Sequence, residues 1–237
     1  MIFQSHAEIP ILAANEVHLW LARIDKGAED HLSADEISRA SRYLNKIERL
    51  GYRMGRNALR KILSGYLSIE PGKIHLELDQ HGKPMLSKRF HPQFIEFNMS
   101  HSDQLILFAF TRARRVGVDI EHIRPFPELA RLVSRYFTEK ESSTIRRISN
   151  QERTSAFFSG WTRKEALLKA IGKGLRIPLN TFEVSLDPSE EEPHLYLPQK
   201  LSEDAHWRLI SFSPAEEYIA ALAVEGRGWK IKSYKFA

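Results

Sequence analysis

Two acidic residues interrupt an apolar stretch near the middle of the chain, RRVGVDIEHIRP, where Asp119 and Glu121 alternate with Val118 and Ile120. Successive side chains of a strand point to opposite faces, so this spacing predicts that the two carboxylates lie side by side. Like charges at that distance repel unless a cation or a proton lies between them. The stretch alone leaves two interpretations, a metal site and a solvated strand face, and by itself it favours the solvated face.

A third carboxylate and a lysine lie four residues apart in SGWTRKEALLKAIGKGL. Helical spacing predicts that Glu165 and Lys169 share one side of a helix, next to its buried face. Two structural alternatives stay open: Glu165 closes a capping box begun by Thr162, or it pairs with Lys169 at the surface. The upstream NQERTSAFFSGW has helical spacing too and a better cap in Ser149 or Asn150, which disfavours the capping box.

Together, Asp119, Glu121 and Glu165 would supply hard oxygen ligands suited to Mg²⁺, and Lys169 a cation suited to phosphate. The residues that follow, Gly172 to Gly174, are expected to end the helix and to bring the further positive charge of Lys173 nearby.

The stretch FNMSHS places Ser100 beside His101. Neighbours in a strand point to opposite faces, so the two are not expected to form a nucleophile and its base. His101 taken alone indicates a structural or surface histidine. At the end of a strand, however, a hydroxyl, an imidazole ring and free backbone N–H groups can together receive phosphate oxygens.

Periodicity predicts the elements that position these residues. Strands are expected over 17–24, 73–79, 116–121, 182–186, 206–212, 218–224 and 229–236, and two more over 94–110, joined around Ser102 and Asp103. Helices are expected over 32–67, where Ser33 and Glu36 could form a capping box, and over 128–137, 138–148 and 150–172. This order of helices then strands, repeated once, predicts two similar halves that meet near residues 111–117.

Six arginines recur through the stretch 32–67, and we expect them mostly on a solvated face, with a grip on phosphate as the alternative. They are Arg39, Arg42, Arg49, Arg53, Arg56 and Arg60.

Composition narrows the class of protein. The 237 residues, 42% of them hydrophobic, can bury a sizeable core. The absence of cysteine excludes disulfides, zinc–thiolate sites and a cysteine nucleophile, and no leader or membrane span is recognisable, so we expect a soluble, cytoplasmic protein. The net charge of +5 suits an anionic ligand or an acidic partner protein, whereas neither a lysine tail nor an aromatic nucleic-acid motif is present. Neither nucleic acid nor a membrane is therefore an expected partner.

Taken in order, FNMSHS, GVDIE and WTRKEALLKAIGKGL, with GKP at 82–84 upstream, resemble the 4′-phosphopantetheinyl transferases of the surfactin-synthetase-activating (Sfp) type. The resemblance runs from Leu32 to Val224, and EVHLWLARID and GRGWK further resemble cyanobacterial members. It implies an α+β fold of two similar halves related by a pseudo-twofold axis, residues 1–112 and 113–237, with the active site in the cleft between them. It also implies a monomer, unlike the shorter trimeric holo-carrier-protein synthases.

The resemblance also implies roles for single residues. It makes Asp119, Glu121 and Glu165 the Mg²⁺ ligands. The positions that match contacts to coenzyme A, which include the lysine of GKP, are Arg39, Lys83, Ser100, His101 and Lys169. Glu141, in FTEKES, matches a further acid that positions or activates the attacking hydroxyl.

The implied reaction moves the 4′-phosphopantetheine arm of coenzyme A onto a serine of an apo acyl or peptidyl carrier protein and releases 3′,5′-ADP. Such carriers serve fatty-acid, polyketide or nonribosomal-peptide synthesis. Either Glu165 or Glu141 could be the general base, and the sequence does not choose between them. Two rival functions are a Mg²⁺-dependent nuclease or phosphohydrolase and a basic binding module.

Overall fold

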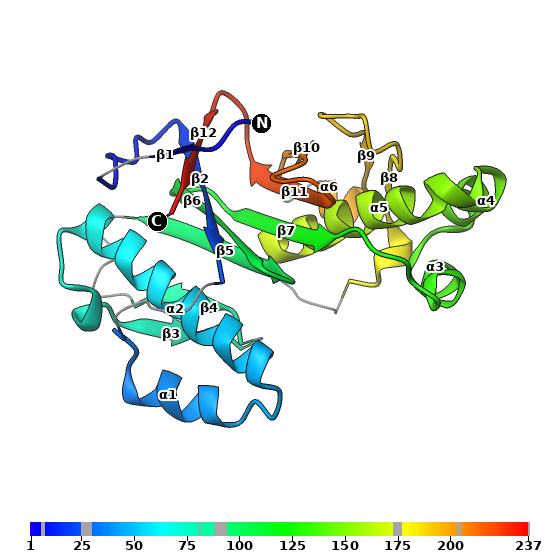
Figure 1. Cartoon of the computed structure of the whole chain (residues 1–237). Helices are drawn as coiled ribbons and strands as arrows, with labels where there is room; N and C mark the ends of the chain where they lie inside the picture. Colours follow the sequence, from blue (N-terminus) through cyan, green and yellow to red (C-terminus); the bar gives the residue numbers. More distant parts are fainter. Residues whose placement is uncertain are drawn as a thin grey trace. The chain divides into compact units, whose positions relative to one another are not determined.

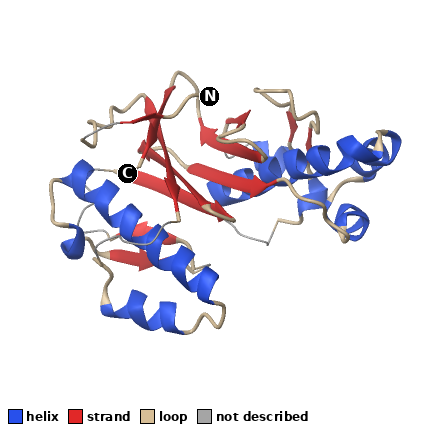
Figure 2. Ribbon diagram, in the orientation of Figure 1, coloured by secondary structure: helices blue, strands red, loops and turns tan. Residues whose placement is uncertain are grey.

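The protein is described from a computed structural model that covers residues 1–5, 8–24, 30–80, 82–87, 94–172, 177–202 and 205–236. The chain divides into two compact units. The C-terminal unit comprises Met1, Asn98–Ser100 and Arg114–Gly228, and the N-terminal unit comprises Ile2–Phe97, His101–Ala113 and Trp229–Ala237. Both contain helices and strands (Figures 1 and 2), which confirms the α+β class. The pseudo-twofold relation and the division at residues 112 and 113 stay predictions.

The N-terminal unit is built on a sheet with strand order β1-β12-β2-β6-β5. These strands are β1 (Gln4–Ser5), β2 (Glu16–Arg23), β5 (Ile95–Ser102), β6 (Leu105–Arg112) and β12 (Lys230–Lys235). The middle of β5, Asn98–Ser100, belongs to the C-terminal unit. The unit also holds α1 (Ala34–Ser41), α2 (Lys46–Leu67), the 3-10 turn η1 (Pro71–Lys73) and the hairpin of β3 (Leu76–Leu78) and β4 (Pro84–Leu86).

The start of α1 confirms the predicted capping box, in which the Glu36 backbone N–H donates to Ser33 Oγ and the Ser33 backbone N–H donates to Glu36 Oε2. The expected solvated face of arginines is wrong at two positions, because Arg56 and Arg60 are buried. The Arg60 guanidinium donates from Nε to Glu36 Oε2 at 2.8 Å and from Nη1 to the carbonyl of Ile74 at 2.8 Å. These contacts join α2 to α1 and to the turn after α2, so Arg60 is a structural residue.

The C-terminal unit is built on a three-stranded antiparallel sheet of order β10-β11-β7, namely β10 (Trp207–Phe212), β11 (Tyr218–Glu225) and β7 (Val116–His122). Its helices are α3 (Leu129–Tyr136), α4 (Glu139–Arg147), α5 (Asn150–Ile171) and the short α6 (Gln199–Ser202). The 3-10 turn η4 (Leu179–Thr181) precedes a small hairpin of β8 (Glu183–Val184) and β9 (Leu195–Tyr196). Figure 1 shows α5 running along β7.

Helix α5 begins where the upstream pattern predicts, with Ser149 as its N-cap. Thr162 is not a cap, because its hydroxyl lies inside the helix and donates to the carbonyl of Phe158 at 2.9 Å. The helix ends at Gly172, whose φ of 73° is favourable for glycine. The expected further charge at Lys173 lies outside the described residues.

From Ala156 to Ile171, every residue of α5 is buried except three half-buried positions, Trp161, Glu165 and Lys169. These three are spaced four residues apart and therefore form one stripe along the helix. The helix thus buries most of its circumference and leaves one narrow side for Glu165 and Lys169. None of the helices in the described parts of the chain is long and apolar enough to span a membrane.

Candidate active site

The face of β7 that carries the two acidic residues is covered by α5. A Cβ atom built on Gly117 would lie 2.1 Å from the carbonyl oxygen of Ala166 and 2.4 Å from the backbone nitrogen of Ala170, so this face of β7 lies directly against the helix. Alternation in the strand places Asp119 and Glu121 on the same face as Gly117. Asp119 is only 5% exposed, and the interpretation as a solvated face is therefore wrong.

Asp119, Ser100 and Lys169 form a compact polar cluster between β5, β7 and α5. The Lys169 ammonium donates to Asp119 Oδ1 at 2.6 Å, to Ser100 Oγ at 2.9 Å and to the carbonyl of Val118 at 3.3 Å. The Ser100 hydroxyl in turn donates to Asp119 Oδ1 at 2.7 Å. Three of the predicted site residues, which come from three separate stretches, are thus within hydrogen-bond distance of one another.

Asn98 lies next to this cluster and is a residue that the sequence interpretation did not single out. It is buried, and its Oδ1 accepts from the backbone N–H of Val118 at 2.9 Å, which fixes β5 against β7. The signal was present in FNMSHS, because Asn98 and Ser100 are two residues apart and share a strand face.

Glu165 lies on α5 near the two acids of β7. Burial raises the pKa of its carboxyl group, and the nearby Asp119 and Glu121 raise the pKa further, while Lys169 opposes them. The three predicted ligands therefore interact electrostatically within the C-terminal unit. A bound cation would neutralise the negative charge of these carboxylates.

One oxygen of Asp119 suits a hard cation such as Mg²⁺. Asp119 Oδ2 is buried and accepts no hydrogen bond from the described residues, although a buried carboxylate oxygen normally has a partner. Carboxylate oxygens are the ligands that Mg²⁺ prefers. Among the described residues, however, no three acidic or histidine side chains are grouped closely enough to form a ligand cluster by themselves.

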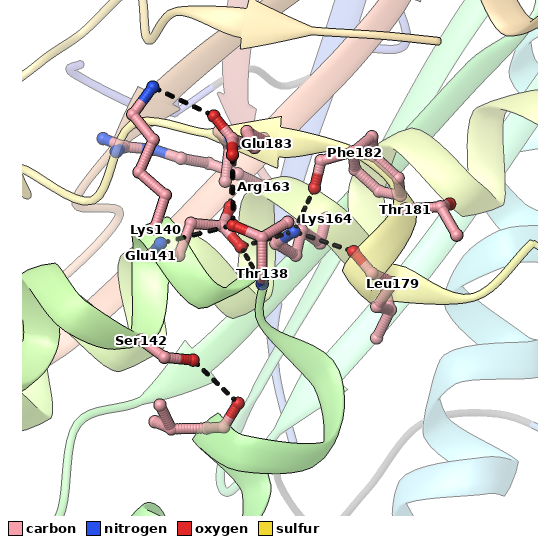
Figure 3. A network of polar contacts seen from close by, with 12 residues as sticks. Thr138, Lys140, Glu141, Ser142, Arg163, Lys164, Leu179, Thr181, Phe182 and Glu183 are labelled. Atoms are coloured by element: carbon pink, nitrogen blue, oxygen red, sulfur yellow. Dashed lines mark hydrogen bonds and ion pairs between the residues drawn. The ribbon is translucent and has the colours of Figure 1, made fainter.

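Glu141 belongs to a different cluster, shown in Figure 3. It is 3% exposed and serves as the third residue of α4, where its Oε2 accepts from the backbone N–H of Thr138 at 2.8 Å. The same oxygen forms an ion pair with the buried Lys164 at 2.9 Å, and Oε1 accepts from the backbone N–H of Val184 at 2.9 Å. These are the contacts of a buried structural carboxylate.

The remaining candidates, Arg39, Lys83 and His101, belong to the N-terminal unit. Arg39 lies near the turn that carries Lys83, since a Cβ atom built on Gly82 would be 4.0 Å from Arg39 Nη2. His101 is exposed and lies beside α2, where a Cβ atom on Gly51 would be 3.8 Å from its ring. The opposite orientation expected for Ser100 and His101 agrees with these positions, because Ser100 is buried against β7.

The buried carboxylate of Asp119 thus lies beside a lysine, between a strand and a helix of an α+β fold, and carboxylates and lysines are residue types that bind cations and phosphate. Two protein-family models match the chain, one described as the 4′-phosphopantetheinyl transferase superfamily over residues 115–223 and one as the N-terminal part of a 4′-phosphopantetheinyl transferase over residues 26–112. The chain belongs to this family and is a transferase of the Sfp type.

Named relatives agree with this assignment. The chain is 36% identical to the 4′-phosphopantetheinyl transferase HetI of Nostoc sp. over 95% of its own length and 94% of the relative. It is 31% identical to a putative 4′-phosphopantetheinyl transferase of Synechocystis sp. over 81% and 78%, and 27% identical to Sfp of Bacillus subtilis over 65% and 66%. The first two are cyanobacterial, which confirms the predicted resemblance to cyanobacterial members.

Proposed function

We propose that this protein transfers the 4′-phosphopantetheine group of coenzyme A to a serine of apo acyl or peptidyl carrier proteins in a Mg²⁺-dependent reaction. The observation that carries the proposal is the cluster of Lys169, Asp119 and Ser100 beside Glu165. A lysine next to a serine hydroxyl suits a pyrophosphate, and the surrounding carboxylates suit a divalent cation. In this proposal Asp119, Glu121 and Glu165 would hold Mg²⁺, and the ion would neutralise negative charge on the phosphate oxygens.

The chain's own residues would then bind and orient the donor. Lys169 would contact the pyrophosphate of coenzyme A, and Ser100 would lie near the same group. The resemblance further implies that Arg39, Lys83 and His101 contribute contacts to coenzyme A, Arg39 at the 3′-phosphate. The carrier's serine oxygen attacks the phosphorus that bears the pantetheine arm. A new P–O bond forms as the bond to the bridging oxygen breaks, and 3′,5′-ADP leaves. Orientation of the two reactants accounts for much of the acceleration.

We assign the general base to Glu165. A base must come within hydrogen-bond distance of the proton that it accepts, and Glu165 is half-buried beside the cluster whereas Glu141 is buried among structural contacts. A cytoplasmic location and a monomeric state remain predictions.

The proposal is tested by intact-protein mass spectrometry of an apo acyl carrier protein incubated with coenzyme A, Mg²⁺ and this protein. The expected result is a mass gain of one phosphopantetheine group per carrier, which is absent when EDTA replaces Mg²⁺. No gain on acyl and peptidyl carriers alike would overturn the proposal. A mass gain in the presence of EDTA would support the transferase activity and contradict its dependence on Mg²⁺.

Lys169→Met is expected to weaken coenzyme A binding by about 10-fold or more, because a charge-assisted hydrogen bond to phosphate is lost. Isothermal titration with coenzyme A measures this effect. Lys140→Met is a matched control, since the Lys140 side chain is 73% exposed and pairs with Glu183 on another part of the C-terminal unit. Equal affinities for the Lys169 variant and the control would remove Lys169 from the coenzyme A site.

A further inference from the structure

The buried ion pair of Glu141 and Lys164 is not used by the chemistry above, yet Lys164 immediately precedes Glu165 in α5. Lys164 is 0% exposed, and its ammonium donates to the carbonyls of Leu179 at 2.8 Å and Phe182 at 2.6 Å. With the contact to Glu141 at 2.9 Å, all three donor positions of the ammonium have partners. Figure 3 shows the Lys164 nitrogen pointing toward these oxygens.

Glu141 connects this ammonium to two other elements. Its carboxylate accepts from the N-cap residue of α4, Thr138, and from Val184 of β8, so α4, β8, η4 and α5 meet at one charged pair. Burial lowers the pKa of the Lys164 ammonium, and the Glu141 carboxylate opposes that effect by favouring the charged form.

The preceding residue, Arg163, is held in the same way on another side of the helix. Its guanidinium is buried and donates to Ser211 Oγ at 2.8 Å, to the carbonyl of Ser185 at 2.6 Å and to the carbonyl of Asp187 at 2.7 Å. Consecutive side chains of a helix point about 100° apart. Two long side chains fixed in two directions restrain both the rotation of α5 and its position along its axis, just before Glu165.

We infer that Glu141 and Lys164 form a positioning pair that holds Glu165 in place, and that Glu141 acts through Lys164 rather than on the substrate. The inference rests on the proposed transferase function. A positioning pair and a general base respond oppositely to paired substitution. Removing one partner of a buried ion pair leaves an uncompensated charge, whereas neutralising both partners relieves it. A base, by contrast, is lost whenever its carboxylate is removed.

The experiment compares Lys164→Met with the double variant Glu141→Gln/Lys164→Met, because both lack the ammonium and differ only at residue 141. We expect Lys164→Met to lower kcat by about 100-fold through misplacement of Glu165. Adding Glu141→Gln should raise kcat by about tenfold and also raise Tm, since it removes the unpaired carboxylate. The KM for coenzyme A should change less than kcat. Lys140→Gln, on the exposed side of α4, serves as the control, and we expect it to have the kcat and Tm of the wild-type protein.

A kcat that falls further when Glu141→Gln is added would overturn the inference, because that further loss is expected only if Glu141 takes part in the chemistry. If Lys164→Met does not fold, the pH profile of Glu141→Gln decides. If Glu141 has a positioning role, the plateau of kcat against pH should be lower while the fall in kcat at acidic pH is retained. Loss of that fall at acidic pH would contradict the role. Wild-type protein that transfers nothing to any carrier refutes the proposed function instead, and the Tm comparison still reports on the pair.

Discussion

Glu165→Gln is expected to lower kcat for phosphopantetheine transfer by about 10³-fold, the effect typical of a lost general base. The fold should persist, because the carboxyl group already lies among like charges. Its pKa is raised in the folded state, so ionised Glu165 destabilises the protein as the pH rises above the ordinary range of a glutamate. The glutamine variant lacks this effect and should have an unchanged or higher Tm in EDTA at neutral pH.

Thermal unfolding with and without Mg²⁺ adds a readout that is independent of activity. A ligand that binds the folded state raises Tm by mass action, so Mg²⁺ should raise the Tm of the wild-type protein more than that of Glu165→Gln. Glu216→Gln is a suitable control, because it removes a carboxylate from an exposed turn of the same unit. A variant that unfolds in EDTA would make Glu165 a structural residue, and equal Mg²⁺ responses would exclude it as a ligand.

The pattern of neighbouring residues predicted several helix starts and strands correctly. The Ser33 capping box, the Ser149 start of α5 and the strands on either side of Asp103 all follow from neighbouring residues, and the structure confirms them. Two-residue strands such as β1 and β9 were missed, since so short a segment has no periodicity of its own.

The site was predictable as a set of residues but not as a set of contacts. The ion pair of Lys169 with Asp119 joins residues 50 positions apart, and nothing in either stretch specifies it. Glu141 stands in the charged run TEKE, which is typical of a solvated helix start, and only the tertiary contact with Lys164 buries it. The burial of Arg60 likewise depends on contacts outside its own stretch of helix, because Glu36 of α1 and two carbonyls of the turn after α2 compensate its charge.

Gly117→Ala is expected to destabilise the C-terminal unit by about 3 kcal/mol, the upper part of the range for overpacking. The new methyl group would lie 2.1 Å from the carbonyl oxygen of Ala166, 2.4 Å from the nitrogen of Ala170 and 3.0 Å from its Cα. These are backbone atoms of α5, so no side-chain rotation relieves the clash and the helix itself must move. The Tm should fall by about 6–12 °C, the shift expected for this energy in a protein of this size.

Movement of α5 has a consequence for activity beyond stability. The helix carries Lys169, whose 2.6 Å contact with Asp119 crosses the same interface as the Gly117 approach. Below its Tm, Gly117→Ala should therefore lower kcat by about 100-fold, as expected for a displacement of about 1 Å. Gly72→Ala is the matched control, since a Cβ atom there meets nothing within 4 Å. A folded Gly117→Ala protein with wild-type kcat would show that the helix–strand distance does not control the site.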